Sequence, residues 1–299
     1  MSDDGVTRRA VLGAAAAGAG LALAGCRKQL VDEFVSTRLA EMDRDQVRRF
    51  VGELETRYRE QYGRDVHVAD TPAEEGVLFA YGLDLDRCNG NRKCVEACVE
   101  ENNQSRGGTG HGAPIQWITV LEMDKERGVD LDHANMYYDA EQVPREGHFY
   151  LPVQCQHCDN PPCTKVCPVE ATWKEPDGIV VIDYDWCIGC RCCMSACPYG
   201  ARHFNWTEPN LPAEQLNPEM HVLGNRPRMR GVVEKCTFCV QRTRRGLYPA
   251  CHEACPTGAR VFGNLLDPAS EIRQLIERKR VFLLKAELNT RPSFFYFYG

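Results

Sequence analysis

Residues 187–198 read CIGCRCCMSACP, and four of their cysteines follow the spacing C-x2-C-x2-C-x3-C-P: Cys187, Cys190, Cys193 and Cys197. This spacing wraps three thiolates around one iron–sulfur cluster, while the fourth cysteine serves a neighbouring cluster. A cysteine that serves a neighbour requires a second cysteine group elsewhere in the chain. The stretch therefore predicts an iron–sulfur protein with more than one cluster.

Three further cysteine groups occur, and in chain order the stretch above is the third of four. The second group, residues 155–168, and the fourth, residues 236–256, also end in Cys-Pro. Their candidate ligands are Cys155, Cys158, Cys163 and Cys167 in the second group, and Cys236, Cys239, Cys251 and Cys255 in the fourth. Four groups predict four clusters in a row, and a row of clusters moves electrons.

The first group lacks one thiolate. It supplies Cys88, Cys94 and Cys98, but Asn91 occupies the second ligand position. A neutral amide is a poor ligand for iron in clusters that use thiolates. We therefore expect a three-iron cluster at this site. The alternatives are a four-iron cluster with Asn91 or water on its fourth iron, or an empty site.

The remaining cysteines test other interpretations. Of 17 cysteines, all but Cys26 and Cys192 fall on ligand positions. Cys192 is out of register, which predicts a small buried residue, with direct ligation as the alternative. A disulfide framework gives no role to repeated Cys-Pro groups. Zinc is the stronger rival, but zinc needs four ligands per site and does not explain groups of three plus one.

The N-terminus is typical of an export signal. Arg8 and Arg9 form a twin-arginine pair, residues 10–24 are small and apolar, and LAGC at 23–26 matches a lipoprotein cleavage box. Twin-arginine export carries folded, cofactor-loaded proteins. We expect residues 1–25 to be removed, and Cys26 to carry lipid that holds the protein at the exported, periplasmic face of the cytoplasmic membrane. The alternatives are an uncleaved anchor helix, or a simple signal with an incidental cysteine.

The pattern of the remaining chain predicts an α+β fold. Short strands at 77–84, 179–183 and 230–235 each precede a cysteine group, and a short helix follows, as at 94–101. Strand, cysteine loop and helix repeated in this way make two ferredoxin-like dicluster modules. Long insertions at 102–154 and 199–229, the first with strands at 115–123 and 148–153, are interpreted as docking loops, with surface decoration as the alternative.

An amphipathic helix is expected before these modules, over residues 30–62, with a break near Asp43 and an end at Gly63. It is either a solvated spacer or a docking helix. The aromatic stretch 294–298 either docks on another subunit or folds onto the core of the chain. The expected domains are the signal, the lipid-anchored helix and linker, the four-cluster domain, and a C-terminal helix with an aromatic tail: 1–25, 26–75, 76–268 and 269–299.

Several functions are disfavoured. The net charge of −6 argues against nucleic-acid binding, and no apolar run is long enough to span a membrane. No C-x-x-C-H occurs for covalent haem, and no catalytic residues stand out. His157 and His252 lie beside ligand positions, where they either hydrogen-bond cluster sulfurs or are ordinary packed or solvated side chains.

Three phrases carry a resemblance to a known family: PVQCQHCDNPPC at 152–163, WCIGC at 186–190 and VEKCTFC at 233–239. They resemble the four-cluster, ferredoxin-like subunits of complex iron–sulfur oxidoreductases, over roughly residues 76–299. Members include subunits of polysulfide and tetrathionate reductases, nitrite reductase complexes, hydrogenase-2 and the membrane complex of dissimilatory sulfur metabolism. The resemblance implies an electron wire between a molybdopterin or multihaem cytochrome subunit and a polytopic, quinone-reactive membrane subunit.

The resemblance also implies how the cysteines divide. The first group pairs with the fourth, and the second with the third, and each pair exchanges its last cysteine. The implied ligand sets are Cys88, Cys94 and Cys255; Cys98, Cys236, Cys239 and Cys251; Cys155, Cys158, Cys163 and Cys197; and Cys167, Cys187, Cys190 and Cys193. Relatives usually carry cysteine at the position of Asn91. The expected cofactors are three [4Fe-4S] clusters and one [3Fe-4S], or altered [4Fe-4S], cluster at Cys88, Cys94 and Cys255.

The function predicted is therefore electron relay without substrate chemistry. The competing hypothesis is a catalytic iron–sulfur reductase that uses an open iron at the first site. A third hypothesis is a protein that stores or assembles clusters.

Overall fold

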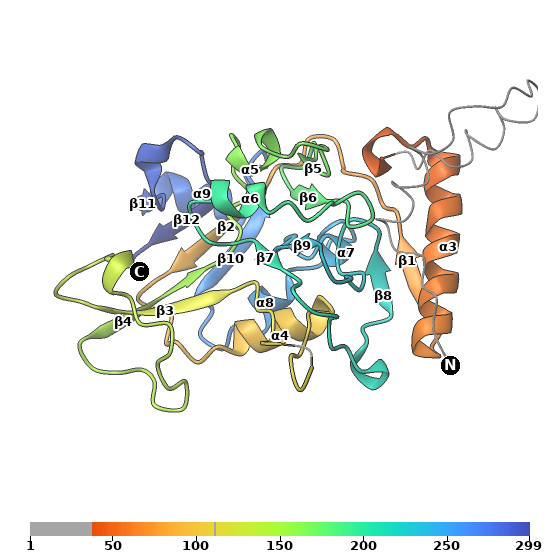
Figure 1. Cartoon of the computed structure of the whole chain (residues 1–299). Helices are drawn as coiled ribbons and strands as arrows, with labels where there is room; N and C mark the ends of the chain where they lie inside the picture. Colours follow the sequence, from red (N-terminus) through yellow and green to blue (C-terminus); the bar gives the residue numbers. More distant parts are fainter. Residues whose placement is uncertain (1–37, 111) are drawn as a thin grey trace, which may run out of the picture. The chain divides into compact units, whose positions relative to one another are not determined.

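The computed structural model describes residues 38–110 and 112–299. These residues divide by their contacts into two units. The described part of the first unit ends at Glu41 and holds one 3-10 helix, η1 (Leu39–Glu41). The second unit, residues 42–299, holds the remaining elements (Figure 1). The predicted signal, with Arg8, Arg9 and Cys26, lies outside the described residues, as does the predicted helical segment 30–37.

Helix α3 (Arg44–Tyr62) begins where the sequence predicted a break. The side chain of Asp43 accepts hydrogen bonds from the backbone N–H groups of Asp45 and Gln46, and Gln46 Oε1 accepts one from the Asp43 N–H at 2.8 Å. This capping box satisfies N–H groups that a helix start leaves without partners. Gly63 ends the helix in the left-handed conformation that glycine adopts easily, with φ of 63°. The predicted end at Gly63 is confirmed, and α3 begins directly after Asp43, where the break was predicted.

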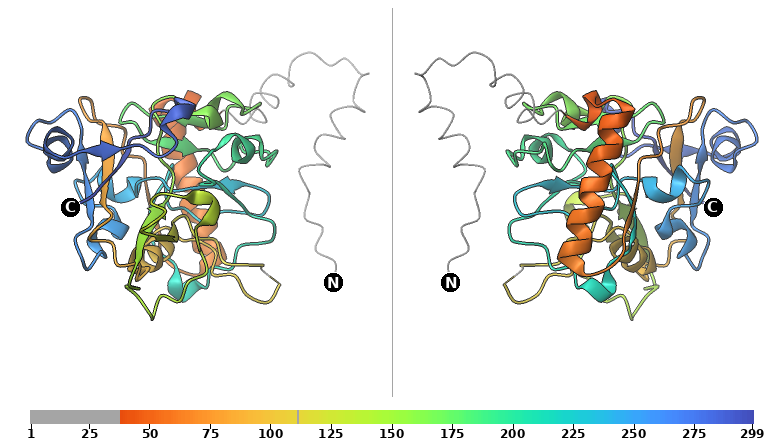
Figure 2. Two further views of the ribbon diagram at one scale, coloured as in Figure 1. Left: turned by 90° about the vertical axis from the view of Figure 1, so that its left-hand side faces the viewer. Right: turned by 90° about the vertical axis from the view of Figure 1, so that its right-hand side faces the viewer.

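One face of α3 packs against the rest of the second unit, where the helix lies along one side (Figure 2). Leu54 and Tyr58 are buried, and the Tyr58 hydroxyl donates to the carbonyl of Pro227 at 3.3 Å. Arg57 forms a salt bridge with Asp185 at 3.3 Å. Within its described part, the predicted helix is therefore not a fully solvated spacer. No helix in the described part of the chain is long and apolar enough to cross a bilayer.

Two modules carry the cysteine groups. In the first module, β2 (Phe79–Asp84) pairs antiparallel with β10 (Arg260–Asn264), and α4 (Lys93–Glu101) packs on α8 (Ala250–Glu253). In the second, β5 (Thr172–Lys174) pairs antiparallel with β6 (Val180–Ile182), and α5 (Pro162–Lys165) packs on α6 (Cys192–Ala196). The first module thus joins the first and fourth cysteine groups, and the second joins the second and third.

The insertions add small sheets around these modules. β3 (Thr119–Asp124) and β4 (His148–Val153) form an antiparallel pair within the first insertion, close to both predicted strands. The remaining elements of the second unit are β1 (His67–Ala69), which pairs with β8 (Glu219–His221); β7 (His203–Phe204), which pairs with β9 (Val233–Glu234); α7 (Val240–Thr243), within the fourth cysteine group; α9 (Glu271–Arg278); η2 (Leu131–His133); η3 (Ala213–Gln215); and η4 (Ala286–Leu288).

The aromatic C-terminal segment belongs to the core. β12 (Phe294–Phe297) lies between β2 and β11 (Val281–Phe282) in the sheet order β10-β2-β12-β11. Phe294 and Tyr296 are fully buried, and the Phe294 ring stacks on Tyr81 with ring centroids 4.9 Å apart. The interpretation of this segment as a docking tail is therefore wrong. Phe294, Tyr296 and Phe297 are covered by the chain itself, and β12 pairs in parallel with β2; only the last aromatic residue, Tyr298, is exposed.

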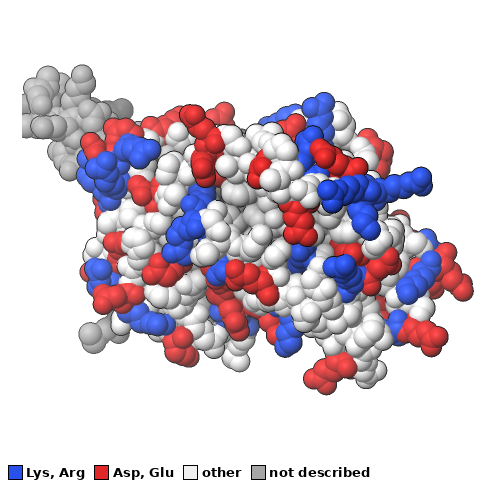
Figure 3. All heavy atoms as spheres, turned by 180° about the vertical axis from the view of Figure 1, so that it is seen from behind, with Lys and Arg blue, Asp and Glu red and all other residues white. Residues whose placement is uncertain are grey.

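The surface seen from behind carries both signs of charge (Figure 3). Lys and Arg side chains are interspersed with Asp and Glu across this face. Interspersed charges are typical of a surface that faces water.

Candidate iron–sulfur cluster sites

The turn after each Cys-Pro pair brings a donor to a cysteine sulfur. In each turn the third residue after the cysteine has left-handed backbone: Glu170, Gly200 and Gly258, with φ of 51°, 62° and 61°. The alanine that follows donates its backbone N–H to the sulfur of that cysteine, at 3.2 Å for Ala171 and Cys167. The other two pairs are Ala201 with Cys197 and Ala259 with Cys255. Hydrogen bonds of this kind stabilise a thiolate and tune a cluster potential.

The first site is a small cavity lined by three cysteines of the implied set: Cys88, Cys94 and Cys255. Burial raises the pKa of the Cys88 thiol to about 11, opposed by the N–H of Gly90. Burial also acts to raise the pKa of Cys255, but hydrogen bonds from Thr257 and Ala259 outweigh it, so the net shift is downward. The structure brings these three cysteines together as the family resemblance implied.

Asn91 lines the same cavity. Its side-chain oxygen accepts a hydrogen bond from the backbone N–H of Lys93 at 3.0 Å, at the start of α4. Its own N–H donates to the side chain of Asn89 at 3.3 Å. The amide oxygen is thus engaged with the backbone of α4, a local role that Asn side chains commonly take.

The fourth site is fully buried and gathers Cys98, Cys236, Cys239 and Cys251. The carboxamides of Gln104 and Asn102 donate to the Cys98 sulfur at 3.2 Å and 3.6 Å, and Asn102 also reaches the Cys239 sulfur at 3.5 Å. The Tyr81 hydroxyl lies 3.3 Å from the Cys251 sulfur. Burial raises the pKa of the Cys239 thiol to about 12, so a stable thiolate here needs a compensating positive partner such as iron.

The second and third sites lie in the other module. The Cys158 thiol has the three other members of its implied set as close electrostatic neighbours: Cys155, Cys163 and Cys197. In the third set, Cys193 lies near Cys187, and the exposed Cys190 lies near Cys192, which in turn lies near Cys167. The structure therefore assembles the second set fully, whereas in the third set Cys190 is exposed to solvent.

Cys192 is exposed, so the prediction of a buried residue is wrong. Cys192 is the first residue of α6, and its neighbour Cys193 is the one turned into the core. Successive residues on a helix face different directions, so both cannot be buried together. Its thiol hydrogen-bonds with that of Cys190.

Both candidate histidines are packed side chains. His157 is buried, packs against Phe238 with ring centroids 3.8 Å apart, and accepts the backbone N–H of Val180 on Nδ1 at 3.0 Å. His252 stacks on Tyr248 with centroids 4.3 Å apart. Burial lowers the pKa of each imidazole, which favours the neutral form.

Buried positive charges beside the cysteines show whether the thiols suit an anionic iron–sulfur cluster. Arg202, Lys235 and Arg260 are buried beside the cysteines. Arg202 Nη1 and Arg260 Nη2 are buried without a hydrogen-bond partner, and buried charge is costly unless it is balanced. Thiolates around an anionic iron–sulfur cluster would supply that balance. In the described residues no three His, Cys, Asp or Glu side chains are placed to hold a single metal ion, so the fit rests on the donor set.

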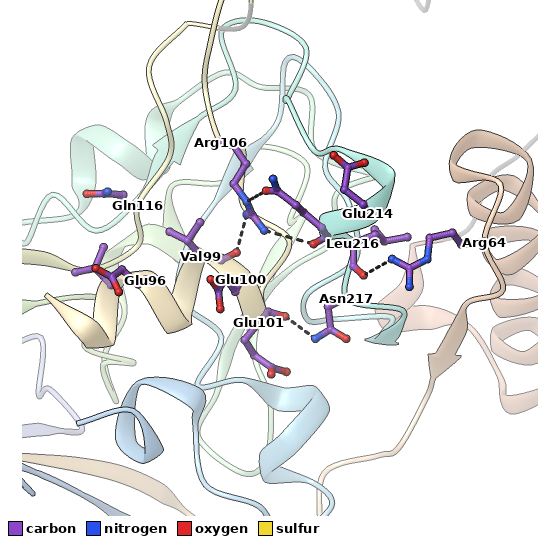
Figure 4. Close-up of a pocket in the computed structure, with 12 residues that line it drawn as sticks. Arg64, Glu96, Val99, Glu100, Glu101, Arg106, Gln116, Glu214, Leu216 and Asn217 are labelled. Carbon is purple, nitrogen blue, oxygen red and sulfur yellow. Dashed lines mark hydrogen bonds between the residues drawn. The ribbon is translucent and has the colours of Figure 1, made fainter. Parts of the chain in front are cut away.

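A large groove lies away from the thiols, between α4 and η3 (Figure 4). Its two arginines are engaged with backbone carbonyls: Arg64 with Ala213 at 2.8 Å, and Arg106 with Val99 at 2.8 Å. Glu100 and Glu214 also line it. The groove has a volume of about 930 Å³ and no cysteine lines it, so it is separate from the cluster sites.

Sequence reasoning found the cysteines but missed the groups around them. The alanine donors, the carboxamides of Asn102 and Gln104, and the buried arginines were not identified. The repeated CPYGAR and CPTGAR, at 197–202 and 255–260, were the available signal for two of these features. Fold and sites together define an iron–sulfur protein with two dicluster modules.

Comparisons with known proteins agree with that class. Two family models described as 4Fe-4S dicluster domains match, one at 147–215 and 223–265 and the other at 86–171. The Hdr-like menaquinol oxidoreductase iron–sulfur subunit 1 of Archaeoglobus fulgidus is 40% identical over 76% of this chain and 86% of its own length. The menaquinone reductase iron–sulfur cluster-binding subunit of Nitratidesulfovibrio vulgaris is 37% identical over 74% and 88%, and a tetrathionate reductase subunit of Salmonella typhimurium is 36% identical over 73% and 71%.

The chain therefore belongs to the family of 4Fe-4S dicluster-domain subunits of oxidoreductases. It is an iron–sulfur electron-transfer protein, as the sequence motifs predicted. The rival zinc interpretation finds no support in these matches.

Proposed function

We propose that the chain relays single electrons through four clusters in the spatial order first, fourth, second, third. The observation that carries this order is a continuous series of thiol neighbours. Cys94 lies near Cys251, joining the first site to the fourth. Cys236 lies near Cys155, joining the fourth to the second. Finally, Cys163 lies near Cys193, joining the second site to the third.

The two ends of this series are the points of exchange with partners. At the third site, Cys190 is exposed beside Ile188, whose side chain is 60% exposed. At the first site, Arg92 lines the cavity and donates to the carbonyl of Met136 at 2.7 Å, next to Tyr137, which is 86% exposed. Exposed apolar side chains at both ends support docking of two different proteins.

The partners that we propose are a polytopic, quinone-reactive membrane subunit and a molybdopterin or multihaem cytochrome subunit. The name of one relative, a menaquinone reductase subunit, supports the quinone-linked partner, and that of another, a tetrathionate reductase subunit, supports a catalytic reductase partner. The molybdopterin or cytochrome character of the second partner follows from the family resemblance alone. Export by the twin-arginine signal and a lipid on Cys26 would place the relay at the periplasmic membrane face. The three-iron cluster is proposed for the first site, because Asn91 offers no thiolate.

One experiment tests the relay. The protein is purified anaerobically with its clusters, iron and sulfide are counted, and paramagnetic resonance is recorded during stepwise reduction. We expect about 15 irons per chain and magnetic coupling between neighbouring reduced clusters. Zinc in place of iron, or clusters without coupling, would contradict the proposal. Substrate turnover by the isolated chain would favour the catalytic hypothesis instead.

A further inference from the structure

Two arginines occupy equivalent places in the two modules. Residues 197–202 read CPYGAR and residues 255–260 read CPTGAR, so Arg202 and Arg260 each follow a candidate ligand by five positions. The left-handed glycine of each turn has nearly the same φ, 62° and 61°. Both arginines are only 4% exposed. The repeat therefore buries one guanidinium at the same point of each module.

Arg202 lies between the second and third sites. Its Nη2 donates to the sulfur of Cys163 at 3.0 Å and to the hydroxyl of Thr172 at 3.0 Å. After Cys163, the thiol with the strongest electrostatic interaction with the Arg202 guanidinium is Cys193, from the third site. The guanidinium therefore faces thiols of both sites in its module.

Arg260 lies between the first and fourth sites. Its Nη1 is 3.8 Å from the sulfur of Cys251 and 3.2 Å from Gln154 Oε1, and its guanidinium carbon lies 5.5 Å from the centre of the Tyr81 ring. The thiol with the strongest electrostatic interaction with the Arg260 guanidinium is Cys94, from the first site. The same relation to two sites therefore holds in the other module.

Other buried arginines differ in their partners. Arg226 pairs with Asp185 at 2.6 Å, Arg228 with Glu234 at 2.8 Å, and Arg244 with Asp177 at 2.8 Å. Among the described residues, no carboxylate forms a salt bridge with Arg202 or Arg260, and each has one buried nitrogen without a hydrogen-bond partner. Burial acts to lower the pKa of both guanidinium groups, but nearby thiols outweigh it. Their charge is thus directed at the cysteines.

We propose that Arg202 and Arg260 are fixed buried charges that raise the reduction potentials of the two clusters on either side of each. Arg260 acts on the first and fourth clusters, and Arg202 on the second and third. An electron added to a cluster beside a fixed cation is electrostatically stabilised, and neighbouring reduced clusters then repel each other less. Guanidinium suits this role because it stays protonated in proteins. The inference rests on the proposed assignment of clusters to sites.

The test is redox titration of the loaded protein, followed by paramagnetic resonance. Arg260→Gln should lower the reduction equilibrium constant of the first and fourth clusters by about tenfold, which is about 59 mV for one electron. Arg202→Gln should do the same to the second and third clusters only. Each variant is the control for the other, and Arg→Lys at either position should restore most of the potential. Arg273→Gln, at an exposed pair with Glu277 on α9, should change none.

A second variant keeps the test decisive if removal of the arginine prevents cluster assembly. Gln154→Glu would place a carboxylate beside Arg260 while keeping the guanidinium, and should also lower the first and fourth potentials. Unchanged potentials in a loaded Arg260→Gln or Gln154→Glu protein would overturn the inference. Equal falls at all four clusters would also overturn it. If the purified wild-type protein holds no clusters, the proposed assignment of clusters to the four sites is contradicted.

Discussion

The side-chain oxygen of Asn91 lies 3.0 Å from the backbone nitrogen of Lys93 and accepts its hydrogen bond. This contact at the start of α4 engages the amide oxygen, which is the better ligand atom of the side chain, with the backbone. Iron binds the sulfur of a thiolate far better than a neutral amide. Cys88, Cys94 and Cys255 then form a set of three, which supports a three-iron cluster.

Asn91→Cys should therefore convert this cluster to a four-iron cube and lower its potential. Iron content should rise from about 15 to about 16 per chain, and the three-iron resonance of the oxidised protein should disappear. Asn91→Ala is the matched control: it should keep the three-iron signal and cost about 1 kcal/mol through the lost contact with Lys93. A changed cluster signal in Asn91→Ala would instead identify Asn91 as a ligand.

Tyr81→Phe should lower the potential of the fourth cluster. The Tyr81 hydroxyl lies 3.3 Å from the sulfur of Cys251, and a donor to a cluster sulfur stabilises the reduced state. A bond worth about 1 kcal/mol corresponds to a shift of a few tens of mV, readable by redox titration. Tyr184→Phe is a suitable control, because that buried hydroxyl donates to the carbonyl of Gly224. Equal shifts in both variants would mean that the effect is not specific to the sulfur.

The sequence predicted those parts of the fold that local pattern determines. β2, β4 and β6 lie within a few residues of the predicted strands, because each precedes a cysteine group or alternates in hydropathy. The pairing of β12 with β2 was not predicted, since it joins residues more than 200 positions apart and no local pattern encodes it. The same distance explains why the sequence left open whether the aromatic tail docks on another subunit or folds onto the core.

For the cluster sites, too, the sequence predicted what local spacing determines and missed what depends on distant parts of the chain. Ligand positions follow from spacing, because one short loop supplies three thiolates to a cluster. The arginine at 202 was missed because its sulfur partner is Cys163, supplied by another cysteine group. Cys192 was placed wrongly, because its direction depends on where α6 begins.

Phe294→Ala should destabilise the protein by about 3–5 kcal/mol, the usual cost of removing a buried aromatic ring. Its ring is fully buried and stacks on Tyr81, beside the fourth site, so iron should be lost together with stability. Tyr298→Ala, in a side chain 46% exposed, should cost far less. Denaturant unfolding and iron analysis measure both. Retained iron and stability in Phe294→Ala would contradict the core assignment of β12.

Cys26→Ser should abolish lipid attachment without changing cluster content. Cys26 lies in the predicted lipoprotein box, far in sequence from every candidate ligand. Mass spectrometry of the mature wild-type protein should find a lipid-bearing Cys26 at its N-terminus, and the variant should leave the membrane fraction when partners are absent. Replacing Arg8 and Arg9 by lysine should retain the protein in the cytoplasm. A mature wild-type protein that begins elsewhere would refute the lipid prediction.

Ile188→Glu and Tyr137→Glu should each disrupt exchange at one end of the relay. Ile188 is exposed beside the third site, and Tyr137 is exposed beside the first, so a new charge at either position opposes docking of an apolar partner surface. In the assembled complex, one variant should slow reduction of the clusters and the other should slow their oxidation, each by at least about tenfold. Iron content should stay unchanged in both.

Leu266→Glu is the control for these two variants. Leu266 is 58% exposed, but it lies in the turn between β10 and α9 and belongs to neither end of the relay. Stopped-flow spectroscopy with quinol on one side and the terminal acceptor on the other separates the two half-reactions. If Ile188→Glu and Tyr137→Glu slow the same half-reaction, electrons enter and leave by one end, and the linear order is wrong. If the control slows either half-reaction as strongly, the effect reports surface charge alone. Opposite effects of the two variants would support the linear order from the first site to the third.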